Sequence, residues 1–468
     1  MVITAPPPAK VSSRRIVDLW ASLPTDYKES DLGSNFMLRL FDYLGVNHHQ
    51  IKNEPTIGRG LKPDYLIYND LEQPPVLVIE IKKREAALAE VSDAKFVATC
   101  QEHPRYKDAV GLSPAPNNGI IQYLDINKVN PSHLASYGLV FNGDFFQLWR
   151  RVDGLVIPMM TVKRVNKTSL PKLLKELVKC LQAPPSALVT AIWNSKGGVS
   201  KTTNTINVAA CLALAGKRVL LIDLDPQNDL TTGLGLKADY APNYFDRIYE
   251  KLQLQELEHA KDILMASIQT KSYATTDGKS FHLSLLSATK DYLNNINDAV
   301  RAHSQYVIFN KLLELIRYNY DYIFIDASPK FDNLARCLLC TTDTILLPFD
   351  SGTKSLKHAI ELSAKIIPTI QVMRDKADDF TVGPWSLGLL YSNCPAQIGV
   401  GMDKAIADVI KTQGFTGKQV SKRLITFDRV KQAEFQGKPV VCWQNSQITK
   451  LFHELTTEVF LGHNYSNN

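Results

Sequence analysis

Residues 196–203 read Lys-Gly-Gly-Val-Ser-Lys-Thr-Thr, and this stretch decides the fold of the larger part of the chain. It follows an apolar run at residues 187–193, which predicts a buried strand, and precedes a helical pattern at residues 203–215. Such a strand, turn and helix form a phosphate-binding loop, because backbone N–H groups and the positive end of the helix face anionic oxygens. The stretch therefore predicts binding of a nucleoside triphosphate.

The stretch departs from the usual phosphate-loop pattern of Gly, four residues, then Gly-Lys-Ser/Thr at two positions. Ser195 stands where the first glycine is expected and Ser200 where the second is expected, while Lys201 and Thr202 are retained. A side chain at position 200 must be accommodated where the backbone passes close to a phosphate. The alternative interpretation is a glycine-rich turn that carries a surface lysine.

Two further apolar runs end in carboxylates. Residues 219–222 lead into Asp223 and Asp225, and residues 322–325 lead into Asp326. A doubly wound parallel sheet places its ligand site at the carboxyl ends of its strands, where acids can hold Mg²⁺ through waters and orient an attacking water. The alternative interpretation of any single one is a strand-terminal Asp that caps the next helix.

These motifs together resemble the ParA/MinD family of deviant P-loop ATPases, over roughly residues 187–462. The resemblance rests on residues 196–203, 221–227 and 325–329, with support from residues 343–348 and 386–391. It implies a doubly wound, mostly parallel sheet and an ATP-dependent homodimer that sandwiches two ATP molecules.

The resemblance also implies roles for individual residues. Lys196 would reach the phosphates bound by the partner subunit, and Lys201 would hold the β and γ phosphates. Thr202 would bind Mg²⁺, Asp326 would support the metal shell, and Asp225 would position the water. Asp223 would be a further acid near the metal. The nucleotide-binding residues would be Lys196, Gly197, Gly198, Val199, Ser200, Lys201, Thr202 and Thr203.

Composition places the chain among soluble globular proteins of more than one domain. It has 468 residues, 45% hydrophobic and 21% charged, with a net charge of +6 and seven scattered cysteines. No apolar run reaches the roughly 18 residues that a membrane-spanning helix needs. We expect a cytoplasmic protein, because scattered cysteines favour a reducing compartment, and the resemblance to ParA implies that it associates with the nucleoid.

The most convincing domain boundary lies near residue 184, where Ala-Pro-Pro-Ser ends an amphipathic pattern. Pro-Pro cannot continue a helix. We therefore predict an N-terminal domain at residues 1–183, with a loose tail at 1–12 and a connecting helix at 169–182. The ATPase domain is predicted at residues 187–468.

The N-terminal part carries a second group of candidate residues. Residues 62–68 and 76–82 predict two strands of a hairpin, with Asp64 at the start of the first. Glu80 and Lys82 differ by two positions, so they share a face of the second strand. Asp64 and Glu80 could then hold a divalent cation, while Lys82 orients a water or steadies charge on a phosphate.

This arrangement resembles the PD-(D/E)xK nuclease family, and more closely the N-terminal nuclease domain of type I restriction enzyme motor subunits. The resemblance covers roughly residues 25–155 and implies a smaller α/β restriction-endonuclease-like domain. Glu54 would be the upstream acid, although Glu29 competes for that role, and Gln122-Tyr123 falls after the lysine at a spacing that is not the family's. The alternative is a solvated ion pair on an exposed hairpin.

A cluster of basic residues lies in the C-terminal third, at Lys418, Lys422, Arg423, Arg429, Lys431 and Lys438. ParA-type proteins use C-terminal basic residues to hold DNA without sequence preference, and we assign this role to Arg423 and Arg429. Such binding neutralises phosphates and weakens steeply with salt. The alternative is a solvated helical face.

The leading hypothesis is an ATPase that dimerises on ATP, binds DNA non-specifically and acts in plasmid or chromosome partition or cargo positioning. A small DNA-binding or adaptor protein would stimulate hydrolysis. The rival is an ATP-switched, metal-dependent endonuclease of a defence or DNA-processing system, which would need a second divalent metal. A regulatory module with ATP as a slow timer is a third possibility.

Overall fold

The computed structural model describes residues 13–84, 91–102, 119–183, 186–240, 243–299, 302–376, 383–395 and 399–462. These residues fall into two compact units, an N-terminal unit of residues 13–183 and 460–462 and a C-terminal unit of residues 186–376 and 383–459. The predicted tail at 1–12 and the Pro184-Pro185 break lie outside the described residues.

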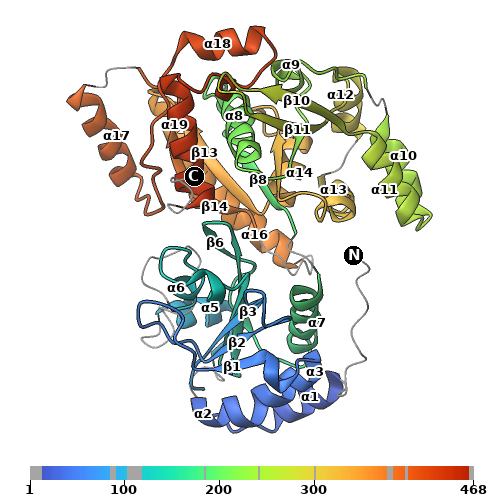
Figure 1. Ribbon diagram of the computed structural model, residues 1–468, viewed down its shortest axis with the longest axis vertical. Helices are drawn as coiled ribbons and strands as arrows, with labels where there is room; N and C mark the ends of the chain where they lie inside the picture. The colour runs from blue at the N-terminus through green and yellow to red at the C-terminus, as the bar shows by residue number, and fades with distance from the viewer. Residues whose placement is uncertain are drawn as a thin grey trace. The chain divides into compact units, whose positions relative to one another are not determined.

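The C-terminal unit is built on a seven-stranded sheet (Figure 1). Its strand order is β10-β11-β9-β12-β8-β13-β14, and every neighbouring pair is parallel except β10 with β11. The predicted mostly parallel sheet is therefore confirmed. The strands are β8 (Leu188–Ile192), β9 (Val219–Asp223), β10 (Gln269–Ala274), β11 (Ser280–Leu286), β12 (Tyr322–Asp326), β13 (Thr344–Phe349) and β14 (Trp385–Tyr391).

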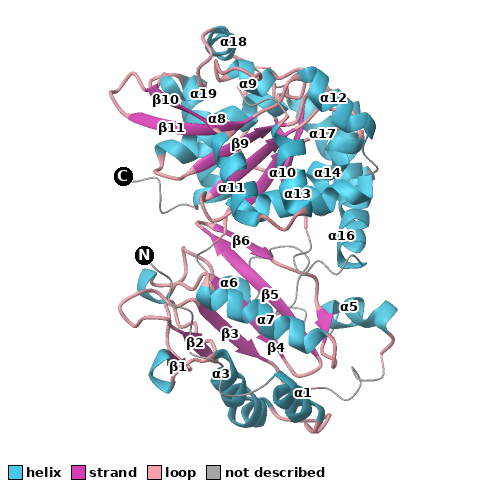
Figure 2. Ribbon diagram, turned by 90° about the vertical axis from the view of Figure 1, so that its right-hand side faces the viewer, coloured by secondary structure: helices cyan, strands magenta, loops and turns pink. Residues whose placement is uncertain are grey.

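Helices cover both faces of this sheet, with α8 and α19 over one face and α13 and α14 over the other (Figure 2). The larger helices are α8 (Lys201–Leu214), α9 (Asp229–Gly233), α10 (Tyr244–Gln253), α11 (Leu257–Ala266), α12 (Lys290–Ala299), α13 (Ala302–Ile316), α14 (Asn333–Thr341), α15 (Thr353–Glu361), α16 (Ile367–Lys376), α17 (Val400–Thr412), α18 (Asp428–Phe435) and α19 (Gln447–Thr456). Single-turn segments lie at Leu362–Ile366, Val440–Cys442 and Thr457–Leu461.

Burial explains why the strands of this unit read as continuous apolar runs. All residues of β8, β9 and β12 are buried, because helices shield both faces of a parallel sheet. On one face, Val189 and Ala191 of β8 join a core cluster with α13, α14 and α15. The central strand β8 lies between β12 and β13, which brings the loop after β8 next to the end of β12.

The N-terminal unit has its own mixed sheet, in the order β1-β2-β3-β4-β5-β6, with β7 paired to β5. Only β3 and β4 are parallel neighbours. The strands are β1 (Ile51–Asn53), β2 (Tyr65–Ile67), β3 (Leu77–Ile81), β4 (Tyr137–Phe141), β5 (Phe145–Val152), β6 (Leu155–Pro158) and β7 (Lys163–Arg164). The predicted hairpin is confirmed as the antiparallel pair β2 and β3.

Two hydrophobic clusters cover the two faces of the N-terminal sheet. Leu77, Ile79 and Ile81 pack with helices α1, α3 and α7, whereas Val78 packs with α5 and α6 on the opposite face. The helices are α1 (Ser13–Ala21), α2 (Glu29–Leu32), α3 (Leu38–Leu44), α5 (Asp93–Glu102), α6 (Gly119–Tyr123) and α7 (Ser169–Gln182), with short turns at Gly33–Met37, His48–Gln50 and Pro131–His133.

None of the helices in the described ranges is long and apolar enough to cross a membrane. The seven cysteines are buried free thiols.

Candidate functional site

The loop between β8 and α8 has the conformation that its glycines permit. Gly198 has φ of +78° and Ser200 has φ of +60°, so a non-glycine residue stands in the left-handed region immediately before the helix. The helix begins at Lys201, two residues earlier than the hydrophobic pattern indicated. A Cβ built at Gly197 or Gly198 would meet no atom within 4 Å, so the outer side of the loop is open.

Two lysines of this loop differ in environment. Lys201 is buried, and its Nζ donates a hydrogen bond to the carbonyl oxygen of Lys196 at 3.0 Å. Burial lowers the pKa of the Lys201 ammonium, while Asp326 and Asp225 oppose that shift. Lys196 is exposed, and its backbone N–H donates to Asn194 Oδ1 at 3.0 Å. One lysine therefore faces the interior of the loop while the other remains at the surface.

The carboxyl ends of β9 and β12 carry a pair of acids in register, because Asp326 and Asp223 are directly paired positions. Thr202 Oγ1 donates to Asp326 Oδ2 at 2.7 Å, which ties the first turn of α8 to the end of β12. The other oxygen, Asp326 Oδ1, is buried and has no hydrogen-bond partner among the described residues. Burial raises the pKa of Asp326 to about 8, with Asp223 adding to the shift.

Asp223 differs from Asp326 because both of its oxygens accept hydrogen bonds within the unit. Oδ1 accepts from Asp225 N at 3.1 Å, and Oδ2 accepts from the N–H and hydroxyl of Thr231. Burial raises the pKa of Asp223 to about 6. Asp225 is also buried, its Oδ1 accepts from Gln227 N at 3.0 Å, and burial raises its pKa. The structure thus brings these acids and the phosphate loop to one edge of the sheet.

The residues at this edge fit a magnesium–nucleotide complex. A buried carboxylate oxygen without a donor is costly, and a cation in reach of Asp326 Oδ1 and Thr202 Oγ1 would satisfy it. No group of three or more His, Cys, Asp or Glu in the described part of the chain could by itself hold a metal ion. A bound Mg²⁺ would therefore take most of its ligands from phosphate and water, as this ion usually does.

Three polar residues beside the loop, Asn393, Thr426 and His358, were not predicted from the sequence. Asn393, just after β14, donates from Nδ2 to the carbonyl of Gly198 at 3.4 Å, and Thr426 Oγ1 donates to Asn393 Oδ1 at 2.6 Å. Ser195, at the first departure from the glycine pattern, contacts His358 Nδ1 at 3.1 Å. The strand at residues 386–391 supported the resemblance, but it ends without an acid, so the residue pattern did not point to Asn393.

In the N-terminal unit the structure brings Asp64, Glu80 and Lys82 together. Asp64 directly precedes Tyr65, which pairs with Ile79, and Glu80 directly follows Ile79 on β3. Lys82 Nζ forms an ion pair with Glu80 Oε1, and Asp64 Oδ2 accepts from Ile81 N at 2.6 Å. Burial raises the pKa of Asp64 to about 7, and Glu80 adds to the shift. This is a desolvated carboxylate pair with one cation.

Two more residues join this cluster. Burial raises the pKa of Glu80, the ion pair with Lys82 opposes the shift, and the Glu29 carboxylate adds to it. Glu29 adds to the raised pKa of Asp64, after the larger effects of burial and Glu80. Burial lowers the pKa of Lys82, but Glu80 and then Glu29 raise it, so that the pKa of Lys82 is raised as a whole. The hydroxyl of Tyr123, in α6, donates to the carbonyl oxygen of Lys62 at 3.3 Å, and Tyr123 opposes the raised pKa of Glu80. Of the two upstream acids, Glu29 raises the pKa of all three residues, whereas the backbone N–H of Glu54 donates to the carbonyl oxygen of Asp64 at 2.9 Å.

A buried arginine explains how Glu29 reaches the cluster. Arg84 Nη2 pairs with Asp144 Oδ1 at 2.6 Å, and Nη1 donates to the carbonyls of Leu23 and Pro24, each at 3.0 Å. The Arg84 backbone N–H donates to the carbonyl of Tyr27 at 3.2 Å. The hydrogen bonds of Arg84 therefore fix the segment before α2, the helix that begins with Glu29.

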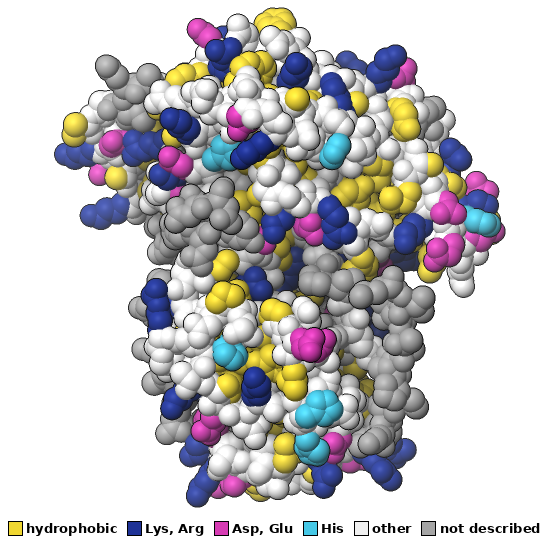
Figure 3. All heavy atoms as spheres, in the orientation of Figure 1, with side chains coloured by type: hydrophobic (Ala, Val, Ile, Leu, Met, Phe, Trp, Pro, Cys, Tyr) yellow, Lys and Arg dark blue, Asp and Glu magenta, His cyan; other side chains and the backbone are white. Residues whose placement is uncertain are grey.

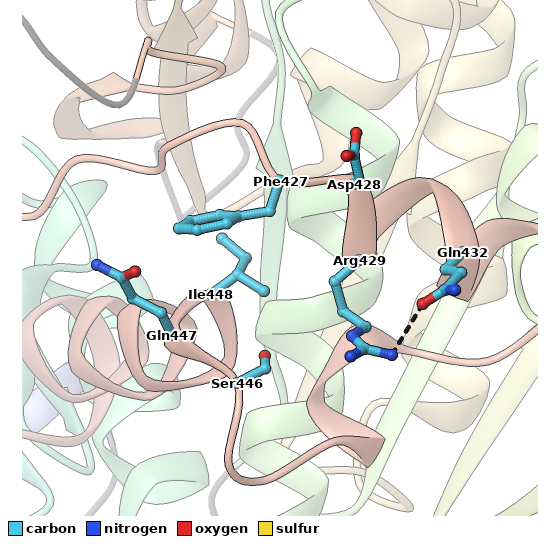
Figure 4. Close-up of a pocket in the computed structure, with 7 residues that line it drawn as sticks. All are labelled: Phe427, Asp428, Arg429, Gln432, Ser446, Gln447 and Ile448. Carbon is cyan, nitrogen blue, oxygen red and sulfur yellow. Dashed lines mark hydrogen bonds between the residues drawn. The ribbon is translucent and has the colours of Figure 1, made fainter.

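The two arginines assigned to DNA lie in different environments. Arg423 pairs with Asp403 at 2.7 Å, so part of its charge is compensated. Arg429 donates to Gln432 at 2.8 Å and lies 5.7 Å from the Trp443 ring, and neither contact neutralises it. Arg429 borders a surface pocket of about 450 Å³ between the starts of α18 and α19, with Phe427 and Ile448 opposite it (Figure 4).

Lys and Arg side chains on the face shown in Figure 3 are scattered over the C-terminal unit among neutral and apolar groups. A second basic residue of the predicted cluster, Lys422, pairs with Glu454 at 2.8 Å. The basic run in the sequence is therefore partly neutralised in the fold.

Comparison with known proteins gives a family context for the C-terminal unit. Residues 187–380 match the family model described as AAA domain. The chain is 29% identical over 280 residues to the sporulation initiation inhibitor protein Soj of Bacillus subtilis, which covers 58% of this chain and 97% of Soj. It is 33% identical over 184 residues to the chromosome partitioning protein ParA of Myxococcus xanthus, covering 37% of this chain and 58% of that protein.

Solved structures give weaker likenesses. The ATP complex of a Cyanothece McdA variant aligns with a TM-score of 0.46 at 19% identity, covering 60% of this chain and 99% of that one. The Pyrococcus furiosus cell division ATPase MinD aligns with a TM-score of 0.41 at 17% identity, covering 59% of this chain and 98% of that one.

The C-terminal unit is similar to the partition ATPases of the ParA/Soj kind, as the family match, these relatives and the phosphate loop indicate. The family match begins at residue 187 and leaves the N-terminal unit without an assignment.

Proposed function

We propose that this protein is an ATPase that dimerises on ATP, binds DNA without sequence preference and acts in partition or positioning of DNA or another cargo. The observation that carries the proposal is the Thr202–Asp326 contact beside the buried Lys201, at the ends of two strands in register. The relatives named for chromosome partitioning support the biological role.

The residues of the phosphate loop would divide the work of nucleotide binding. Lys201 binds the β and γ phosphates, while the exposed Lys196 reaches the nucleotide of the partner subunit. Mg²⁺, held through Thr202 with support from Asp326, neutralises charge on the phosphates when it is bound. Asp225 orients the attacking water. Asn393 and Thr426, which share a hydrogen bond beside Gly198, would support the loop from the side of β14.

Contact with DNA would involve Arg429 first, because it carries a charge that no described acid pairs with. Neutralising phosphates releases counterions, so binding needs no base-specific contact and falls with salt. A small DNA-binding or adaptor protein would stimulate hydrolysis, and the protein would act in the cytoplasm on the nucleoid.

The test combines nucleotide binding, dimerisation and DNA binding in the full chain. Lys201→Ala should abolish nucleotide binding, and Asp225→Ala should bind ATP but accumulate as a dimer on DNA, as measured by light scattering and gel shift. Asp229→Ala, at the first residue of α9, is the matched control and should behave as wild type. An Asp225→Ala variant that stays monomeric at saturating ATP contradicts the sandwich dimer.

A second candidate function rests on the N-terminal cluster of Asp64, Glu80 and Lys82. We propose that this unit is a restriction-endonuclease-like domain that cleaves DNA with a divalent metal. A helix segment, three antiparallel strands, further helices and a strand β4 parallel to β3 support this fold. A desolvated carboxylate pair with an adjacent lysine suits metal-assisted hydrolysis of a phosphodiester.

Supercoiled plasmid distinguishes the two candidates. The full chain is incubated with Mg²⁺ or Mn²⁺, with and without ATP, and nicking is followed on gels. Asp64→Ala and Lys82→Ala should abolish nicking, whereas Asp70→Ala in the turn of the same hairpin should not. Intact plasmid under every condition would reject cleavage and leave the unit a DNA-gripping domain.

A further inference from the structure

Lys271 on β10 contacts the carbonyl ends of two separate helices. Its Nζ donates to the carbonyl oxygens of Leu234 at 2.7 Å and Gly235 at 3.1 Å, which follow α9, and to that of Gly437 at 3.3 Å, which follows α18. An ammonium has three donors, so these acceptors use its full capacity. Burial lowers the pKa of Lys271, with Lys438 adding to the shift.

The backbones that Lys271 joins are already in contact. Gly235 and Gly437 have φ of +63° and +58°, which glycine adopts without strain. A Cβ on Gly437 would lie 2.6 Å from Gly235 Cα, so only two glycines permit this approach. Figure 1 shows α9 and α18 close together near the top of the C-terminal unit, and the two helices pack against each other. Gly235 and Gly437 have no side chains to join the two segments, so the Lys271 ammonium supplies the hydrogen bonds between them.

Both helices also connect directly to the nucleotide site. The segment before α9 contains Asp225, whose carbonyl accepts from Asn228 N at 2.9 Å, and Thr231 of α9 holds Asp223. On α18, Glu434 accepts a hydrogen bond at 3.2 Å from Thr203 Oγ1, which lies in the first turn of α8 directly after the phosphate loop. Helix α18 thus contacts the first turn of α8 and packs against α9, the helix that follows the segment containing Asp225.

We propose that Lys271 is a positioning residue that couples the nucleotide site to α18, the helix that carries Arg429. A phosphate beside Thr203 competes with Glu434 for the hydrogen bond that the Thr203 hydroxyl donates. The negative charge of Glu434 also repels a phosphate nearby. The resulting shift of α18 is transmitted to α9, and back to Asp225, through the Lys271 link. The inference rests on the proposed nucleotide site and adds the means by which that site controls the surface bearing Arg429.

Such a coupling is a free energy between two sites, and it is reciprocal. The test therefore measures the response of one site to a ligand at the other. Lys271→Met keeps the length of the side chain and removes its donors. The variant should fold, because the Tyr273 hydroxyl also donates to the carbonyl of Leu234, at 2.8 Å.

Hydrogen exchange of the amides in residues 428–437 of the full chain measures the coupling without DNA. Adding Mg²⁺ and a slowly hydrolysed ATP analogue should change this exchange in wild type. In Lys271→Met the change should fall by about 5-fold or more, with nucleotide affinity within about 3-fold of wild type. Lys279→Met, at the exposed tip of the same hairpin, is the control and should respond as wild type. If Lys271 were only structural, Lys271→Met would not reduce the exchange response of residues 428–437 while leaving nucleotide affinity nearly unchanged.

The outcomes separate the two ideas. If wild type binds no nucleotide, the proposed function falls. If wild type binds nucleotide but residues 428–437 do not respond, or if Lys271→Met responds fully, the coupling is wrong and the nucleotide site stands. Lys271→Arg, which keeps a cationic donor, should restore at least half of the response if the donor is what matters.

Discussion

Asp223 and Asp326 occupy paired positions on neighbouring parallel strands, yet their carboxylates are used differently. Asp223 accepts hydrogen bonds at both oxygens from Asp225 and Thr231, whereas Asp326 has one oxygen bound to Thr202 and one without a partner among the described residues. Asp223 is thus engaged in holding the segment after β9. Asp326 is the acid that retains a free acceptor for a metal or a metal-bound water.

The first prediction follows from this difference. Asp326→Asn should weaken Mg²⁺-dependent nucleotide binding by about 10- to 100-fold, because residues that support a metal shell typically have effects of that size. Titration of a fluorescent nucleotide with Mg²⁺ and with EDTA measures it. Asp332→Asn, at the cap of α14, is a control and should leave the affinity unchanged. An equal loss in EDTA would show that Asp326 acts without a metal.

The second prediction concerns the left-handed residue before α8. Ser200→Gly should stabilise the C-terminal unit by up to about 1 kcal/mol, because glycine adopts φ of +60° without the steric cost of a Cβ, less its own entropic cost. Ser195→Gly in the same loop is the control and should give no gain, since Ser195 does not have positive φ. The measurement is the thermal unfolding midpoint of the full chain, and a lower midpoint for Ser200→Gly would contradict the strain.

The third prediction concerns pH and Asp64. The folded carboxyl has a pKa of about 7 against an ordinary value of 3.8, so between these values the folded state binds more protons than the unfolded state. Stability of the N-terminal unit should therefore fall as pH rises from about 4 through 7. Asp64→Asn removes this loss and should be more stable than wild type at pH 8 by about 1–2 kcal/mol, but not at pH 4.

Hydrogen exchange of the β3 amides in the full chain, compared with wild type at each pH, measures this difference. Adding Mn²⁺ at pH 8 should stabilise wild type and not Asp64→Asn, because a cation compensates the ionised pair. A variant less stable than wild type at pH 8 without metal would show that Asp64 is not penalised by burial.

The fourth prediction separates structure from positioning at Arg84. Arg84→Met should destabilise the N-terminal unit by about 3–5 kcal/mol, since it leaves Asp144 buried without its partner. Arg84→Met with Asp144→Leu should recover most of that loss. The double variant should still bind Mn²⁺ more weakly, because the carbonyls of Leu23 and Pro24 lose their donor and Glu29 is no longer held. Exchange kinetics and Mn²⁺ titration give the two readouts, and unchanged Mn²⁺ affinity would rule out this role.

The fifth prediction ranks the two arginines. Arg429→Ala should lower DNA affinity more than Arg423→Ala, because Arg423 already pairs with Asp403 at 2.7 Å. Losing one phosphate contact should reduce the slope of log affinity against log salt by about 1. Affinity measured at several salt concentrations with unrelated duplexes tests this. Equal effects of both substitutions would mean that the Asp403 pair opens on DNA.

The N-terminal cluster shows how far sequence reasoning reached. Strand alternation placed Glu80 and Lys82 on one face, and the hairpin brought Asp64 opposite them, because both follow from local geometry. The choice between Glu54 and Glu29 did not follow, because Glu29 reaches the cluster through the Arg84 contacts to a segment some sixty residues earlier. Roles of the individual residues remain predictions.

The sequence by itself determined the phosphate loop, the acids that end β9 and β12 and the mostly parallel sheet, because hydrophobic runs and glycine spacing act locally. Only the tertiary structure decided which acid keeps a free oxygen, which arginine is already paired, and which glycines and lysine join α9 to α18. Those depend on contacts between residues up to some two hundred positions apart, which strand order and helix packing create and which no local pattern encodes.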